Sequence, residues 1–323
     1  MKERLQTEVP PAPAADSLTV LNLPESGEPV WQFPLVDEMT SRQIAEQARN
    51  YQFIYRSMMV PQVTRLGERM FVNWFGNCLA LDLNNGKLLW RNGKSHEIVQ
   101  QSRYYFMQHL FSGSFTILND GERLLALGTG ETGQNHQRSS GLAALDPETG
   151  KTLWNTRTRE DLKAWRFIGQ PILKNGLIYA VAQYNQDLNL YAIAPADGAI
   201  RWQLPLGLME VNNRNRYYGG GGKVMPNPTL IHEDNRLYIL THYGAMIMVN
   251  PGERSVGWAY TYDPPSLNQN NYYRWNQNQN NPLYTVGRPI FADGTVYFKE
   301  AYGQRLHAID TRARNPLWNR PAG

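Results

Sequence analysis

Two glycine-rich stretches have spacings found in phosphate-binding loops. The segment 128–133 (GTGETG) matches G-x-G-x-x-G, whose backbone amides bind a pyrophosphate at the start of a helix. Here it follows one strand pattern and leads through NHQRSS into another, with no helix to hold the phosphate. The segment 219–223 (GGGGK) resembles a P-loop, but Tyr217 replaces its first Gly and Val224 replaces the Ser or Thr that binds Mg²⁺. Both stretches are interpreted as loops.

Histidine and cysteine are the residues that could bind a transition metal. The six histidines show no metal-ligand spacing and are interpreted as surface or strand residues: His96, His109, His136, His232, His242 and His307. Cys78 is the only cysteine, which excludes an intramolecular disulfide, a thiolate cluster and a redox pair. We expect it to be a small buried residue of a strand. The sequence therefore predicts no metal site and no cofactor.

Charge and hydropathy restrict the class of partner. The 32 basic residues exceed the 28 acidic residues only slightly, and the excess is spread along the chain, so nucleic acid is not predicted as a partner. No run approaches the roughly 20 apolar residues of a membrane helix, so no membrane span is expected. The start of the chain, MKERLQTEVPPAPAAD, lacks the apolar stretch of a signal peptide. Residues 1–17 are predicted to be a disordered linker rich in Pro and Ala.

A repeated segment that ends in tryptophan indicates the secondary structure in which the glycines, histidines and cysteine discussed above lie. One copy reads ALDPETGKTLW, and six of the nine tryptophans share its register: Trp31, Trp90, Trp154, Trp202, Trp258 and Trp318. An Asp stands eight residues before the Trp in three copies, Asp82, Asp146 and Asp310. A Gly stands four residues before the Trp in several copies, among them Gly86, Gly150 and Gly198. Such a repeat is typical of a repeat architecture.

Each repeat predicts a unit of four antiparallel strands. Residues alternate before the Asp, the Asp side chain caps a tight turn, and the Gly supplies the positive φ of that turn. Two further strands precede each full copy: one opens near a Pro (Pro61, Pro171, Pro228 or Pro289), and the other is a segment such as RMFVNWF or GLIYAVAQ. The predicted fold is an all-β propeller over residues 18–323, with five full blades and an N-terminal half blade at residues 18–33. The Trp is expected to pack between neighbouring sheets.

Counting strands at the two ends predicts an open or truncated ring. Exposed strand edges are then expected at residues 18–23 and near the first strand after the linker. Such edges are templates for pairing, so the isolated chain is expected to self-associate unless another chain covers them.

The motif formed by Ala144, Asp146, Thr149, Gly150 and Trp154 resembles the repeat of the pyrroloquinoline-quinone-like propeller family. That family includes quinoprotein alcohol dehydrogenases and the propeller lipoprotein that scaffolds outer-membrane-protein assembly in bacteria. The dehydrogenases hold the quinone against a ring formed by two adjacent bonded cysteines, which a chain with one cysteine cannot form. The resemblance therefore implies the scaffold, and a location in the periplasm or cell envelope.

Long inserts on one side of the propeller are predicted to bind a partner. Antiparallel order places the loops between second and third strands, and the passages from each fourth strand to the next blade, on the same side, here called the top face. The inserts are 32–59, 91–109, 130–140, 155–168, 203–225 and 259–286. Aromatic residues and Arg dominate binding hot spots, and the inserts carry Arg49, Tyr51, Tyr55, Arg56, Arg103, Tyr104, Tyr105, Trp165, Arg166, Arg216, Tyr217, Tyr218, Tyr272, Tyr273, Arg274 and Trp275.

Three functions agree with this pattern. The leading interpretation is a non-catalytic scaffold that binds a protein or peptide through the top face. The alternatives are a module that binds carbohydrate or a small molecule through the same aromatic residues, and a quinone-dependent oxidoreductase. The sequence does not identify the partner.

Overall fold

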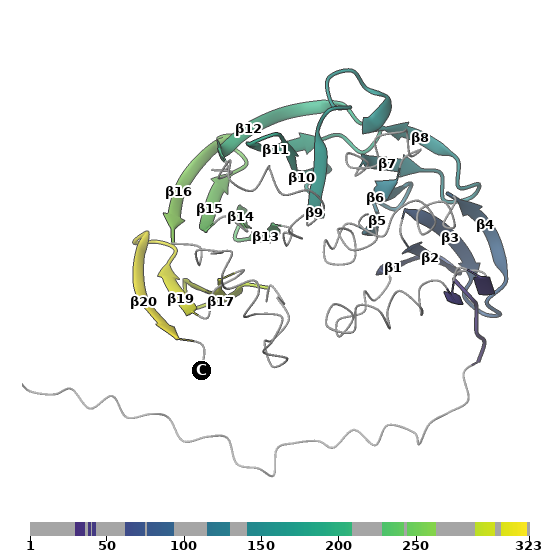
Figure 1. Cartoon of the computed structure of the whole chain (residues 1–323), viewed down its shortest axis with the longest axis horizontal. Helices are drawn as coiled ribbons and strands as arrows, with labels where there is room; N and C mark the ends of the chain where they lie inside the picture. The colour runs from purple at the N-terminus through teal and green to yellow at the C-terminus, as the bar shows by residue number, and fades with distance from the viewer. Residues whose placement is uncertain are drawn as a thin grey trace, which may run out of the picture. The chain divides into compact units, whose positions relative to one another are not determined.

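The chain forms five sheets of four antiparallel strands each in a computed structural model (Figure 1). The structure describes residues 30–35, 38–39, 41–42, 62–74, 76–93, 115–129, 141–208, 228–241, 244–262, 288–300 and 305–321. All five sheets belong to one compact unit, Phe33–Gly323. The all-β class and the four-stranded blades predicted from the repeat are confirmed.

In every sheet the strands pair with their neighbours in chain order. The first two sheets contain β1 Gln62–Leu66, β2 Arg69–Trp74, β3 Asn77–Asp82 and β4 Leu88–Asn92, then β5 Ile117–Asn119, β6 Leu124–Thr129, β7 Gly141–Leu145 and β8 Thr152–Asn155. The third and fourth contain β9 Arg166–Lys174, β10 Leu177–Tyr184, β11 Asp187–Ile193 and β12 Ile200–Leu208, then β13 Thr229–Glu233, β14 Arg236–Leu240, β15 Ala245–Asn250 and β16 Ser255–Thr261. The fifth contains β17 Ile290–Ala292, β18 Thr295–Lys299, β19 Arg305–Asp310 and β20 Asn315–Pro321.

The repeated tryptophan occupies the same register in every sheet. It lies on the fourth strand, directly opposite a small or flexible residue of the third strand: Ala80↔Trp90, Ala144↔Trp154, Ala192↔Trp202, Met248↔Trp258 and Ala308↔Trp318. The pairing slips by one residue at or directly after this pair in each sheet. A small residue opposite the indole leaves room for the ring on that face of the sheet.

The turn between the third and fourth strands is built as the sequence predicts. The Asp146 carboxylate accepts hydrogen bonds from the backbone N–H of Glu148 at 2.9 Å and of Thr149 at 2.7 Å. Asp82 and Asp310 cap their own turns in the same way. Gly86, Gly150 and Gly198 have φ near +70° in these turns, where a side chain would strain the backbone. In the fourth and fifth sheets Arg254 and Arg314 take that left-handed conformation instead.

The core lies between sheets, in four apolar clusters that each join two consecutive sheets. Phe71 and Ala80 of the first sheet meet Leu124 and Ala126 of the second. The other clusters join the second sheet to the third, the third to the fourth and the fourth to the fifth. None of the four contains described residues of both the first and the fifth sheet. Consecutive blades are therefore held together mainly by apolar burial between their faces.

Two details of the sequence prediction were wrong. Pro171 does not open a strand: it lies inside β9, an edge strand, where the pairing with β10 is irregular and no ladder bond to its nitrogen is needed. The inserts were drawn too close to the tryptophans: residues 91–92, 155, 203–208 and 259–261 were assigned to inserts but belong to β4, β8, β12 and β16. The strands therefore run past the tryptophans rather than ending at them. Residues 166–168 of the insert 155–168 already belong to β9.

Other predictions lie outside the described residues, among them the linker at residues 1–17 and all but Val30 to Phe33 of the half blade at 18–33. The boundary at residue 17 therefore stays a prediction. Among the described residues, no helix has the length and hydropathy to cross a membrane.

Candidate functional site

The structure describes two of the sixteen predicted binding residues, Trp165 and Arg166. Both are half-buried and lie where the chain enters β9. The remaining predicted residues lie within 49–56, 103–105, 216–218 and 272–275, outside the described residues. Their role in binding stays a prediction.

The insert that carries Trp165 is short and well ordered by hydrogen bonds. Asn155 caps a 3₁₀ turn, Thr156–Thr158, by accepting a hydrogen bond from the Arg157 backbone N–H. The guanidinium of Arg159 pairs with Asp161 at 2.7 Å and also donates to the carbonyl of Gly198 in the next turn. These contacts fix the path of the chain into the third sheet.

Trp165 packs on the top end of the third sheet with two tyrosines. Its ring centroid lies 5.7 Å from that of Tyr184 and 5.5 Å from that of Tyr191, the latter edge-on. Arg166 donates to the side-chain oxygen of Gln183 at 3.2 Å. Tyr184 remains 37% exposed, so an aromatic patch formed by Trp165 and Tyr184 faces solvent at this end of the sheet. Tyr191 beneath it is buried.

Burial also keeps the Tyr191 phenol neutral. Its removal from water raises the pKa to about 12, although a hydrogen bond with Asn189 opposes the shift. Tyr191 belongs to the cluster that joins the second and third sheets. Its role is therefore to support the exposed aromatic patch and not to exchange protons.

A buried histidine lies near the top of the fourth and fifth sheets. His307, 2% exposed, has Nε2 at 2.8 Å from Glu300 Oε1 and Nδ1 at 3.2 Å from the Tyr260 hydroxyl. The ring of Phe298 stacks on its ring at 4.9 Å. The interpretation of His307 as a simple surface or strand residue missed this network. Its members come together only through the pairing of β18 with β19 and the packing of two sheets, so no sequence spacing indicates it.

Polar groups are also buried where the first two sheets meet at the top. The Asn73 side-chain amide donates to the carbonyls of Thr116 at 2.9 Å and Leu127 at 2.8 Å. Both polar atoms of the Asn77 side chain and the Thr116 hydroxyl are buried without a hydrogen-bond partner among the described residues. Buried polar groups are nearly always satisfied. A buried water molecule could satisfy these atoms.

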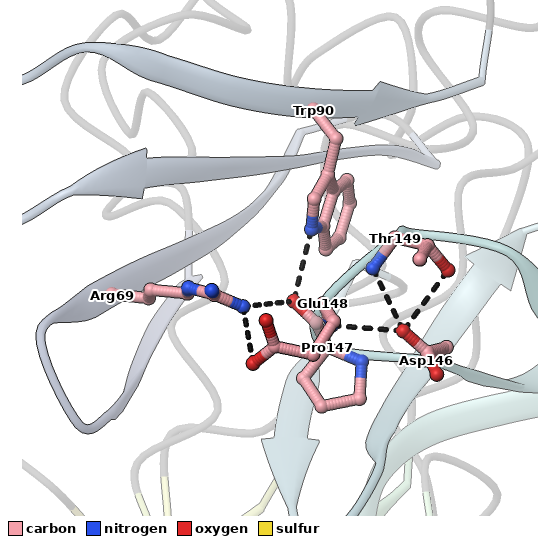
Figure 2. Close-up of polar contacts among 6 residues, drawn as sticks. All are labelled: Arg69, Trp90, Asp146, Pro147, Glu148 and Thr149. Carbon is pink, nitrogen blue, oxygen red and sulfur yellow. Dashed lines mark hydrogen bonds and ion pairs between the residues drawn. The ribbon is translucent and has the colours of Figure 1, made fainter.

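At the first two junctions the repeated tryptophan binds the turn of the next sheet, as Figure 2 shows for the first. In the fourth sheet, Trp258 Nε1 is instead buried without a hydrogen-bond partner among the described residues. Trp90 Nε1 donates to the Pro147 carbonyl at 2.9 Å, and Arg69 pairs with Glu148 at 2.5 Å. The indole lies against Gly150, where a Cβ atom would come within 2.5 Å of the ring. The same geometry recurs at the next junction, where Trp154 Nε1 donates to the carbonyl of Pro195 at 2.7 Å and the indole lies against Gly198.

Few side chains among the described residues could take part in redox chemistry or bind a metal. Cys78 is fully buried, and burial raises the pKa of its thiol to about 12, so the thiolate that would react is disfavoured. No three His, Cys, Asp or Glu side chains in these ranges lie together as metal ligands would.

Comparison with known proteins relates the chain to one family. The family profile described as outer membrane protein assembly factor BamB matches residues 15–320. No curated protein sequence matches the chain. Among solved structures, BamB from Moraxella catarrhalis is similar with a TM-score of 0.51 and 14% identity, covering 81% of this chain and 63% of that one. A quinohemoprotein alcohol dehydrogenase from Comamonas testosteroni has a TM-score of 0.49 and 14% identity, covering 82% of this chain and 43% of that one. The chain thus spans less than two thirds of either protein.

Proposed function

Because the chain belongs to the outer membrane protein assembly factor BamB family, we propose that it is a non-catalytic scaffold of the cell envelope that binds a protein partner through its top face. The family match over nearly the whole chain is the observation that carries this proposal. The family is described as an outer membrane protein assembly factor, and such a factor must contact other proteins. A fold alone does not determine a function, so further support must come from the residues of the top face.

The described part of the top face supports a protein partner. The patch of Trp165 and Tyr184 offers rigid aromatic surface supported from below by Tyr191. Aromatic side chains held in this way are the usual anchors of protein interfaces because little side-chain entropy is lost on binding. The predicted aromatic and arginine residues of the other inserts would extend this surface.

A photocrosslinking experiment in the native host tests the proposal. A photoreactive phenylalanine replaces Tyr184, which is exposed beside Trp165, and in a matched variant it replaces Leu153, 49% exposed on β8. We expect a discrete protein adduct at position 184 and none at position 153. Adducts of equal yield at both positions, or none at either, would contradict a top-face partner.

The two alternatives need separate tests. Incubation with pyrroloquinoline quinone and Ca²⁺ is expected to give no saturable binding and no alcohol-dependent dye reduction, whereas turnover would overturn the non-catalytic proposal. A glycan array is expected to give no specific signal. A glycan bound in a manner lost on Trp165→Ala would favour the carbohydrate alternative, which no described contact supports.

A further inference from the structure

The aromatic patch of Trp165 and Tyr184 carries two hydrogen-bond donors that no described residue uses. Trp165 Nε1 and the Tyr184 hydroxyl make no hydrogen bond within the described ranges, and neither is one of the polar atoms buried there without a partner. Both donors therefore reach the surface. An indole N–H can only donate, and a phenol O–H turns readily toward an acceptor. A ligand of this patch must therefore bring hydrogen-bond acceptors.

The polar side chains that adjoin the two rings in the chain are already hydrogen-bonded. Arg166, which follows Trp165, donates to Gln183 Oε1 at 3.2 Å. Gln183 Nε2 donates to the Asn185 carbonyl at 2.9 Å. The buried Tyr191 supports Trp165 from below through an edge-on contact. The patch thus combines a rigid aromatic surface with the two free donors.

The position of the patch in the third sheet limits the backbone conformation of a ligand. Tyr184 ends β10, which pairs with β9 on one side and β11 on the other, so a ligand strand finds no free edge there. An α-helix uses all but its last carbonyls in internal hydrogen bonds, so it brings few acceptors. A polyproline II segment has no internal hydrogen bonds, and all its carbonyls are free. Its prolines also have no N–H that would need an acceptor.

We propose that this patch binds a proline-rich segment of the partner protein in the polyproline II conformation. The inference rests on the proposed top-face function and adds the chemistry of the partner. Trp165 Nε1 and the Tyr184 hydroxyl donate to backbone carbonyls of the segment, and proline rings pack on the two aromatic rings. The ring centroids are 5.7 Å apart. Two residues of a polyproline II helix span about 6 Å, so the rings contact residues two positions apart.

A synthetic peptide of repeated Pro-Pro-Ala units is the probe, and a flexible peptide of Gly-Gly-Ala units with the same number of carbonyls is the control. Isothermal titration of the full chain is expected to show saturable binding of the proline peptide alone. Trp165→Phe and Tyr184→Phe each keep a ring and remove a donor, so each should weaken binding about threefold to tenfold. Tyr297→Phe removes the hydroxyl of a tyrosine that is 36% exposed on the fifth sheet, and it should leave binding unchanged.

Three outcomes would overturn the proposal: no binding of the proline peptide, equal binding of the two peptides, or an affinity that both Phe variants leave unchanged. If the proline peptide does not bind while position 184 still gives its crosslinked adduct, this inference fails and the top-face function stands. Loss of the adduct as well would contradict the function itself. Because the Phe variants keep an aromatic ring, they are expected to keep the wild-type melting transition, which separates loss of binding from loss of fold.

Discussion

Trp90 at the first junction and Trp318 on the outer face of the fifth sheet follow the same Ala and Asp of the repeat but differ in environment. Trp90 and Trp318 occupy the same register of their sheets, yet Trp90 is bonded to the turn at Pro147, whereas Trp318 is exposed beside Arg320. The motif therefore determines how the third and fourth strands pair within a sheet. Whether the indole is buried depends on a second sheet, which the motif does not supply.

Removal of the indole should separate the two environments most clearly. Trp154→Ala is expected to lower the free energy of unfolding by about 3–5 kcal/mol, because it empties a site between sheets and leaves the Pro195 carbonyl without its donor. Trp318→Ala should cost less than about 1 kcal/mol, the scale of surface substitutions. Urea denaturation followed by circular dichroism measures both. Equal losses would mean that the two tryptophans have the same environment.

The glycine under the indole gives a second comparison. Gly150 and Gly67 both have positive φ, but a Cβ at Gly150 would meet the Trp90 ring at 2.5 Å, while nothing lies within 4 Å at Gly67. Gly67→Ala should therefore cost only the backbone strain, about 1 kcal/mol. Gly150→Ala should cost about 2 kcal/mol or more, because the indole must move as well. A Gly150 variant as stable as the Gly67 variant would show that the indole does not rest on this turn.

The rate at which the Cys78 thiol reacts with a reagent measures how often the first junction opens. It lies in the cluster between the first two sheets, and its raised pKa keeps it protonated near neutral pH. Reaction with a thiol reagent therefore requires local opening. Trp90→Ala should accelerate labelling at least tenfold, equivalent to about 1.4 kcal/mol, and Trp318→Ala should leave the rate unchanged. Rapid labelling of the wild type would contradict the burial of Cys78.

The ion pair between Arg69 and Glu148 at the same junction should contribute the least to the free energy of unfolding. Arg69 and Glu148 are close, but their side chains are 31% and 68% exposed. A double-mutant cycle with Arg69→Gln and Glu148→Gln is expected to give a coupling of about 0.5 kcal/mol that decreases with salt. The cycle for Lys163 and Glu160, a more exposed pair within one segment, serves as the control. A coupling above about 2 kcal/mol would assign the ion pair, rather than the indole, the main part of the docking energy.

The sequence predicts the blades well because their signals are local. The Asp146 turn, the glycine at position 150 and the alternation before them lie within one hairpin, so their spacing is enough. Two kinds of feature were not predictable. The network of His307, Glu300 and Tyr260 depends on the packing of two sheets, which no spacing encodes. The greater exposure of Trp318 depends on what lies beyond its sheet, since its Ala308 and Asp310 stand at the same positions as in the copies with half-buried tryptophans.

Hydrogen exchange of the indole N–H groups tests most directly the claim that Trp90 and Trp154 bind the turn of the next sheet and that Trp318 binds no turn. Two-dimensional NMR of the full chain, assigned with Trp→Phe variants, resolves each indole signal. We predict slow exchange for Trp90 and Trp154, which donate to Pro147 and Pro195, and fast exchange for Trp318. Equal protection of all three indoles in the free protein would contradict the account.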